Sequence, residues 1–321
     1  MNNSSTVVES KSTQTPDQNQ QTHSPTNQHH LFADLALLCT ATLWGINIPV
    51  VKYAVGEIDA FVFNAIRLTI AMLVLGVFAW FENRAGRGFK GPFSKSRLVV
   101  FASLTGFFYM ILFMFGVTRT TAGNVALLLT SMPMCTAVLS YLFIGERLGR
   151  VTWIGLLLTL IGTSTVVLNG GKVDLSEPRF LVGNLMMMGA ALCWASGTII
   201  SRKLLTSLGP MTLAFLASVL TTPLHLMIVA PRMPTELPTM WRTDVVLATV
   251  YSGLFSTGLA YSLWHIGVRQ LGSSHASVYQ NFVTLVALLG SWFFLGEQPA
   301  AVQFYGGILI VAGVLIMRRG R

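Results

Sequence analysis

The chain has 321 residues, of which 53% are hydrophobic and only 10% are charged, against about 25% charged in soluble globular domains. This composition excludes a soluble protein and indicates a membrane protein. The formal charge of +9 does not indicate a nucleic-acid-binding protein, because Lys and Arg are spread over short connections and form no basic face. We therefore expect a lipid bilayer around the chain and no nucleic-acid partner.

Residues 1–30 are rich in Gln, Asn, Ser, Thr and His and have no apolar period. Such a segment cannot bury enough surface to fold alone, so we predict a disordered cytoplasmic tail. No basic start and apolar core precede Leu31, so the first apolar run is expected to remain as a membrane span instead of being cleaved as a signal peptide.

Ten apolar runs follow the tail, each close to the roughly 20 residues that a helix needs to cross about 30 Å of hydrocarbon. The sequence therefore predicts an all-α polytopic membrane protein with ten transmembrane helices. The expected spans are Leu31–Val51, Phe61–Phe81, Leu98–Val117, Thr121–Ile144, Val151–Leu168, Leu181–Ser201, Met211–Ala230, Val245–Val268, Ala276–Leu295 and Ala300–Met317.

Positive charge alternates between the connections. If the N-terminus lies inside, the inner segments contain fourteen Lys and Arg residues and the outer segments contain six, while Arg67 alone falls within a span. The positive-inside rule then places both termini in the cytoplasm, with the chain crossing the plasma (inner) membrane several times.

The chain also contains a repeat. A shift of 150 residues places Trp44 on Trp194, and a shift of 151 matches a Gly-Glu pair and two glycines in the later part of each half. We therefore predict two five-helix repeats, 31–169 and 181–317, with a linker at 170–180 and a basic cytoplasmic C-terminus at 318–321. The pairs matched by the second shift are Gly145-Glu146 with Gly296-Glu297, Gly155 with Gly306, and Gly162 with Gly313.

Five spans are an odd number, so the second repeat must begin on the opposite side of the membrane. Inverted repeats supply two related packings, one open to each side, with a shared site near the midplane. This architecture indicates a protein that carries a solute by alternating access.

Several stretches resemble the EamA-type members of the drug/metabolite transporter superfamily, and the resemblance covers Leu31 to Met317. It implies ten spans in two inverted repeats and the export of amino acids or other small metabolites. The second half departs from the family pattern, since Thr284 stands where the first half has Pro133, so we expect a weaker kink in the ninth span. The stretches are ATLWGINIPVVKYA, RLTIA, TSMPMCTAVLSYLFIGERL, WIGLLLTLIG, LCWASGTIISRKL, YSLWHIGVRQLGSSHASVYQNFVTLVALLGSWFFLGEQ and YGGILIVAG.

Arg67 is the most deeply placed charge, and an ionisable residue inside a span is by default a candidate for function. Its repeat partner is Ala217, so the repeat does not require a charge there. Arg67 either meets a substrate carboxylate, or has a structural role in which its long side chain reaches the outer surface or binds backbone carbonyls.

Trp44 and Trp194 lie well inside their spans, and Asn47 lies one turn beyond Trp44 on the same face. These polar groups either contact substrate or join neighbouring helices. Tyr109, Gln280 and Asn281 add uncharged donors and acceptors that could orient a small polar solute.

Tyr261 and His265 are four residues apart and share a helix face beside Trp264. His265 is the candidate for a proton-coupled step, preferred over His225 because of this company. The alternative is that His265 only forms a hydrogen bond near the inner interface.

The charged groups that the spans lack restrict the class of substrate. A phosphate-bearing solute would need paired basic groups within the spans, and a lipophilic cation would need a buried carboxylate, whereas Asp34, Glu146 and Glu297 all fall at span ends. A small neutral or zwitterionic metabolite fits better, such as an amino acid or a related compound.

The sequence favours a carrier over other classes of membrane protein. An intramembrane enzyme would need clustered catalytic or metal-binding side chains, such as an HExxH pair, and none is found, so we expect no catalysis, cofactor or metal. A scaffold or receptor gains nothing from inverted repeats, and no ring of like charges suggests a channel.

The Gly-Glu pairs are expected to close a hairpin, with Gly ending one helix and Glu near the start of the next.

Overall fold

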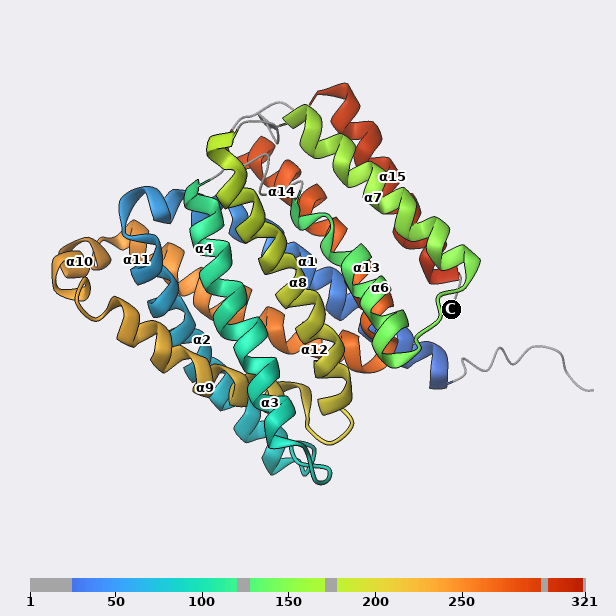
Figure 1. Cartoon of the computed structure of the whole chain (residues 1–321), viewed down its shortest axis with the longest axis horizontal. Coiled ribbons are helices and arrows are strands. Elements are labelled where there is room, and N and C mark those ends of the chain that lie inside the picture. The colour runs from blue at the N-terminus through green and yellow to red at the C-terminus, as the bar shows by residue number, and fades with distance from the viewer. Residues whose placement is uncertain (1–24, 120–127, 171–177, 296–299, 320–321) are drawn as a thin grey trace, which may run out of the picture.

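The computed structural model describes residues 25–119, 128–170, 178–295 and 300–319 (Figure 1). Within these ranges the regular elements are all helical, and one isolated β-bridge joins Phe89 to Leu208. The all-α fold predicted from the sequence is therefore confirmed. The helices are α1 Pro25–Glu57, α2 Ala60–Arg84, α3 Lys95–Ala102, α4 Tyr109–Arg119, α6 Met132–Ile144, α7 Arg150–Gly170, α8 Leu181–Leu204, α9 Pro210–Val229, α10 Met233–Met240, α11 Thr243–Val250, α12 Ala260–Leu271, α13 Ser273–Val278, α14 Gln280–Leu295 and α15 Ala301–Arg319, with π-helical segments η1 Ser103–Phe108 and η3 Tyr251–Leu259 and a 3₁₀ turn η2 Pro178–Phe180.

Six helical segments among the described residues are long and apolar enough to cross a membrane, and α6 and α15 add shorter apolar helices. Figure 1 shows successive long helices running between two opposite edges of the molecule, with the C-terminus and the start of α1 near the same edge. The count of ten spans stays a prediction, because part of the expected fourth span lies outside the described residues. The six segments are Leu31–Glu57, Ala60–Arg84, Lys95–Gly116, Leu181–Leu204, Pro210–Val229 and Thr243–Leu271.

Two predicted boundaries differ from the structure. Helix α1 begins at Pro25, inside the segment expected to be a disordered tail, and proline is well suited to a first helical position. The ninth span is not one helix, because α13 ends at Val278 and α14 starts at Gln280, on either side of a turn at Tyr279. The fourth span has a similar turn just before α6. The ninth span is thus interrupted without a proline, contrary to our expectation of a weaker kink.

The two halves pack as a pseudo-two-fold pair. Helix α2 packs on its counterpart α9, and α7 packs on α15. Two further contacts mirror each other across the halves: α1 packs on α12, and α4 packs on α8. A two-fold rotation that exchanges the halves places each span on its counterpart. It pairs second span with second and fifth with fifth, and it makes the contact of the first span with the third occur twice, as observed.

Helices α7 and α15 lie side by side (Figure 1), and their backbones approach closely at glycines. A Cβ built on Gly155 would lie 2.6 Å from the carbonyl oxygen of Gly313, and one built on Gly162 would lie 2.6 Å from that of Gly306. Because Gly155 is matched to Gly306 and Gly162 to Gly313 in the sequence repeat, the contacts are crossed. Crossed contacts between matched residues require antiparallel helices around a two-fold axis, which supports the inverted arrangement.

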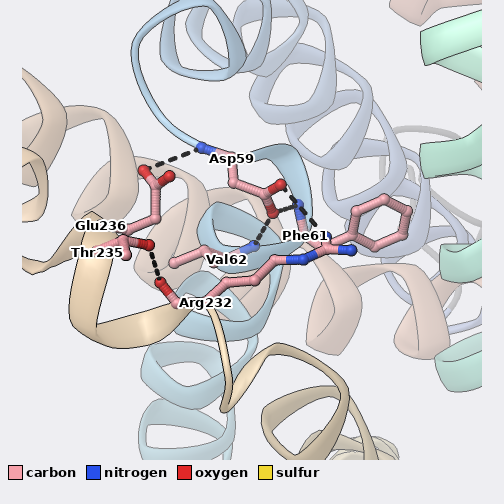
Figure 2. Close-up of polar contacts among 6 residues, drawn as sticks. All are labelled: Asp59, Phe61, Val62, Arg232, Thr235 and Glu236. Atoms are coloured by element: carbon pink, nitrogen blue, oxygen red, sulfur yellow. Dashed lines mark hydrogen bonds and ion pairs between the residues drawn. The ribbon is translucent and has the colours of Figure 1, made fainter.

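At one edge of the molecule, the α1–α2 turn of the first half is joined to α10 of the second half. The Asp59 carboxylate accepts hydrogen bonds from the backbone N–H groups of Phe61 and Val62, both at 3.0 Å, and so caps α2. Its other oxygen pairs with Arg232 at 3.3 Å, and the Asp59 N–H donates to Glu236 (Figure 2). The Asp59–Arg232 ion pair is partly exposed, so it stabilises the contact only weakly.

At the opposite edge, the α2–α3 loop packs on the α8–α9 turn. The N–H of Lys90 donates to the carbonyl of Ser207 at 2.8 Å, and the N–H of Gly209 donates to that of Gly88 at 2.7 Å. The Glu82 carboxylate caps α9 from outside by accepting from the N–H and the hydroxyl of Thr212, at 2.8 and 2.9 Å. The second and seventh spans are thus tied together at both edges.

The Gly145-Glu146 pair closes the α6–α7 hairpin as expected, since Gly145 ends α6 with a left-handed φ of 65°. Glu146 does more than follow the turn. Its carboxylate pairs with Arg202 at 2.8 Å and accepts a hydrogen bond from the Ser273 hydroxyl at 2.8 Å, which joins this hairpin to the second half. The matching Glu297 lies outside the described residues.

Candidate functional site

Five aromatic side chains from both halves meet where α1, α4, α8 and α12 converge. The rings of Trp44 and Trp194, matched by the sequence repeat, lie 5.5 Å apart between centroids in an edge-to-face arrangement. Trp264 and Tyr261 each lie 5.8 Å from Trp194, and Tyr109 lies 5.1 Å from it. These separations fall within the range in which aromatic pairs attract one another. Trp194 is the centre of this cluster.

A cavity adjoins the aromatic cluster between the two halves. Its volume is about 40 Å³, and since one enclosed water needs roughly 10–15 Å³, it is large enough for only a few waters. Helices must therefore shift before a metabolite can enter. None of the described residues that line it is acidic. They include hydroxyl side chains and apolar ones, among them Leu68, Phe101, Thr105, Met110, Trp194, Thr198, Ala217, Thr221, Thr222, Thr257, Tyr261, Trp264 and His265.

Arg67 is buried beside this cavity, with 6% of its surface exposed. Its guanidinium donates to Asn64 Oδ1 at 2.7 Å and Thr257 Oγ1 at 3.0 Å, and it contacts the Met110 sulfur at 3.5 Å. Thr257 and Met110 line the cavity, so one layer of side chains separates it from the guanidinium. Arg67 therefore does not reach the outer surface. Its Nε has no hydrogen-bond partner among the described residues.

Three buried polar atoms in the cavity wall lack a partner among the described residues. They are the Nε1 of Trp194, the Nδ1 of His265 and the Oγ1 of Thr222, whose residues are 5%, 4% and 1% exposed. Trp44 differs from its repeat partner, since its Nε1–H donates to the carbonyl of Ser256 at 2.8 Å. Because an unsatisfied buried polar group costs free energy, these atoms are suited to meet polar groups of a bound solute or water.

Both π-helical segments contribute to the cavity wall, and in each a backbone carbonyl accepts a hydrogen bond from a side chain. The Ser256 carbonyl of η3 accepts the bond from Trp44, and the Gly106 carbonyl of η1 accepts one from His225 Nε2 at 2.8 Å. Single π-helical turns inside α-helices are frequent at functional sites. His225, set aside in favour of His265, thus holds η1 in place.

The structure brings together most, but not all, of the residues singled out from the sequence. Trp194, Tyr261 and His265 line the cavity; Trp44 and Tyr109 pack on Trp194; Arg67 lies one layer behind. The other three, Asn47, Gln280 and Asn281, are not among its lining residues.

Asn281 has a packing contact instead. Its side-chain amide donates to Thr159 Oγ1 of α7 at 2.9 Å, and it is 2% exposed. The side-chain oxygens of Asn47 and Gln280 are buried and lack hydrogen-bond partners among the described residues.

Sequence reasoning missed the π-helical segments and the hydroxyl side chains of the cavity. A signal was present, because the pattern Thr-Gly-x-x-Tyr occurs twice, as Thr105 to Tyr109 and as Thr257 to Tyr261, 152 residues apart. This spacing is close to the repeat shifts of 150 and 151. The matched tyrosines both lie against Trp194, and both threonines line the cavity.

Comparison with known proteins agrees with this architecture. The model of the EamA-like transporter family matches the chain twice, over residues 31–168 and 181–319. The chain belongs to this family. A protein of known crystal structure, 20% identical, superposes with a TM-score of 0.75 over 91% of this chain and 98% of its own, which supports the fold.

Two curated relatives cover most of the chain. The uncharacterized transporter YetK of Bacillus subtilis is 25% identical and covers 88% of this chain and 86% of its own length. The probable terminal-alkyne amino-acid exporter of Streptantibioticus cattleyicolor is also 25% identical and covers 88% and 92%. The chain is thus a multi-pass membrane transporter of small molecules, and its family and relatives are transporters, not enzymes.

Proposed function

We propose that this transporter exports an amino acid or a closely related small polar metabolite across the plasma membrane by alternating access. In this proposal, residues 31–169 and 181–317 are inverted five-span repeats, joined at 170–180, and both termini are cytoplasmic. The observation that carries the proposal is the small cavity between the halves, where aromatic rings stand beside buried polar atoms without partners. The amino-acid exporter among the relatives favours this substrate class.

The cavity supports a carrier better than a pore. Its volume leaves room for only a few waters, and it adjoins the two π-helical segments η1 and η3. In transporters built from inverted repeats, irregular helices near the midplane form the substrate site. Trp194, Tyr261 and Tyr109 then contact the solute, Trp44 supports them, and Arg67 supplies positive charge. His265 remains a candidate for proton coupling.

Flux measurements in proteoliposomes test this function. The full-length protein is reconstituted, loaded with unlabelled amino acids and supplied outside with the labelled compound. We expect saturable counterflow that specific unlabelled amino acids compete away, and none in empty liposomes. Flux that rises linearly with concentration and ignores competitors would show a pore, and absence of flux for amino acids and their derivatives would overturn this substrate class.

A further inference from the structure

The charge balance around the cavity is one-sided. Arg67 is buried and its three described partners are an amide oxygen, a hydroxyl and a thioether, none of which carries negative charge. No acidic side chain is among the described residues that line the cavity. A buried cation without a counter-ion is costly, so the site stabilises a solute that brings a negative charge.

Hydrogen-bonding groups on the cavity wall point to the same chemistry. The Trp194 indole nitrogen carries a hydrogen and can only donate. It has no acceptor among the described residues. A carboxylate is an acceptor and would satisfy this donor, while an ammonium group is a donor and would not. An ammonium group would also lie near the positive charge of Arg67.

The remaining wall suits an apolar body. Leu68, Phe101, Ala217 and Trp264 face the same cavity. Specific pockets commonly combine such apolar surface with a few polar groups that fix orientation. A phenyl, indole or branched aliphatic group would pack against this surface once the helices have shifted to admit the solute.

We propose that the carboxylate is the part of the substrate that this site requires and that a free amino group is dispensable. The substrate class is then monocarboxylates with an aromatic or branched apolar body, including N-acylated amino acids. This inference rests on the proposed transport function and deepens it. It predicts that removing the charge of the amino group does not weaken binding.

The side chain of Met110 lies between the cavity and Arg67. Its thioether contacts the guanidinium at 3.5 Å and also lines the cavity. Methionine is unbranched and flexible, and its sulfur is a weak acceptor. A carboxylate that displaces this sulfur would gain charge-assisted hydrogen bonds with the guanidinium, which are stronger and shorter than the contact they replace.

Binding to the purified full-length protein tests the inference separately from transport. Isothermal titration would compare three matched sets with phenyl, indole and isobutyl bodies, each as the amino acid, the N-acetyl amino acid and the decarboxylated amine. We expect at least one N-acetyl acid to bind as tightly as its amino acid and at least tenfold more tightly than its amine. The inference is overturned if every amine binds as tightly as its N-acetyl acid or more tightly, or if no N-acetyl acid binds. Saturable flux in the proteoliposomes would still support the transport function.

Arg67 variants locate the recognition. Arg67→Gln should weaken binding of the N-acetyl amino acid at least tenfold. It should leave unchanged the binding of the matching N-acetyl amino-acid amide, in which a neutral amide replaces the carboxylate. Arg67→Lys should recover part of the lost affinity. The exposed Arg269→Gln is the matched control and should change neither. Equal loss for acid and amide, or none for the acid, would contradict a carboxylate at Arg67. Should Arg67→Gln fail to fold, the acid-to-amine comparison on the unmodified protein still decides the proposal.

Discussion

The α7–α15 contact and the central cavity both lie between the two halves, but only the first is symmetric with respect to the sequence repeat. Along α7 and α15, matched glycines make equivalent contacts on both sides of the pseudo-two-fold axis. At the cavity the rings are matched but the polar groups are not. Trp44 has a hydrogen-bond acceptor while Trp194 has none among the described residues, and Arg67 lies one layer of side chains behind the cavity whereas its repeat partner Ala217 lines it.

This difference has a physical reason. Two helices that pack back to back around a two-fold axis gain the same contact twice, so a matched sequence suits both sides. A small solute with a polar end and an apolar end has no two-fold symmetry, and a site that holds it in one orientation needs different groups on its two sides. Symmetry therefore persists in packing and is broken at recognition.

The largest expected effect tests the packed region. Gly155→Ala would place a Cβ 2.6 Å from the Gly313 carbonyl oxygen and 2.8 Å from the Met317 backbone nitrogen. These are backbone atoms that cannot rotate away, so we expect a loss of roughly 3 kcal/mol, at the upper end for overpacking. Thermal unfolding of the purified protein, followed by intrinsic fluorescence, would measure it.

Gly290→Ala is the matched control for this change. Gly290 also lies inside a helix, but a Cβ there would meet no atom within 4 Å. The melting temperature should stay the same or rise slightly, since alanine favours the helix. A Gly155→Ala protein as stable as the control would show that the two helices are further apart than the structure has them.

The second prediction sets the matched tryptophans against each other. Trp194→Phe keeps an aromatic ring and removes an N–H that has no described partner, so we expect transport to fall about tenfold, equivalent to one hydrogen bond of ~1.4 kcal/mol to the solute. Trp44→Phe instead removes the bond to the Ser256 carbonyl and should lower stability by about 1 kcal/mol.

Counterflow and melting temperature, measured on both variants, separate these outcomes. Our comparison requires Trp194→Phe to lose transport at nearly unchanged melting temperature and Trp44→Phe to lose stability first. Equal behaviour of the two would mean that the polar asymmetry at the cavity has no role in recognition.

The fold could be predicted from the sequence further than the site could. Apolar runs and the repeat predict an all-helical, duplicated membrane protein, because the length of a span and the positions of its glycines can be read from a short stretch of sequence. Trp44, Trp194 and Tyr261 could be singled out because polar aromatic residues deep in a span need partners. The position of Arg67 behind Thr257 and the π-helical segments could not, since they depend on which helices become neighbours.

Asn281 shows this limit and provides the smallest expected effect. Its residue type and depth predict a substrate contact, but its amide donates to Thr159, which lies between the packing glycines of α7. Asn281 thus belongs to the packed region, and we expect a coupling of about 1 kcal/mol between Asn281→Ala and Thr159→Val in a double-mutant cycle of thermal stability. Transport by Asn281→Ala, corrected for the amount of folded protein, should remain close to that of the unmodified protein. A specific loss of transport without any coupling would place Asn281 at the recognition site and move part of that site towards α14.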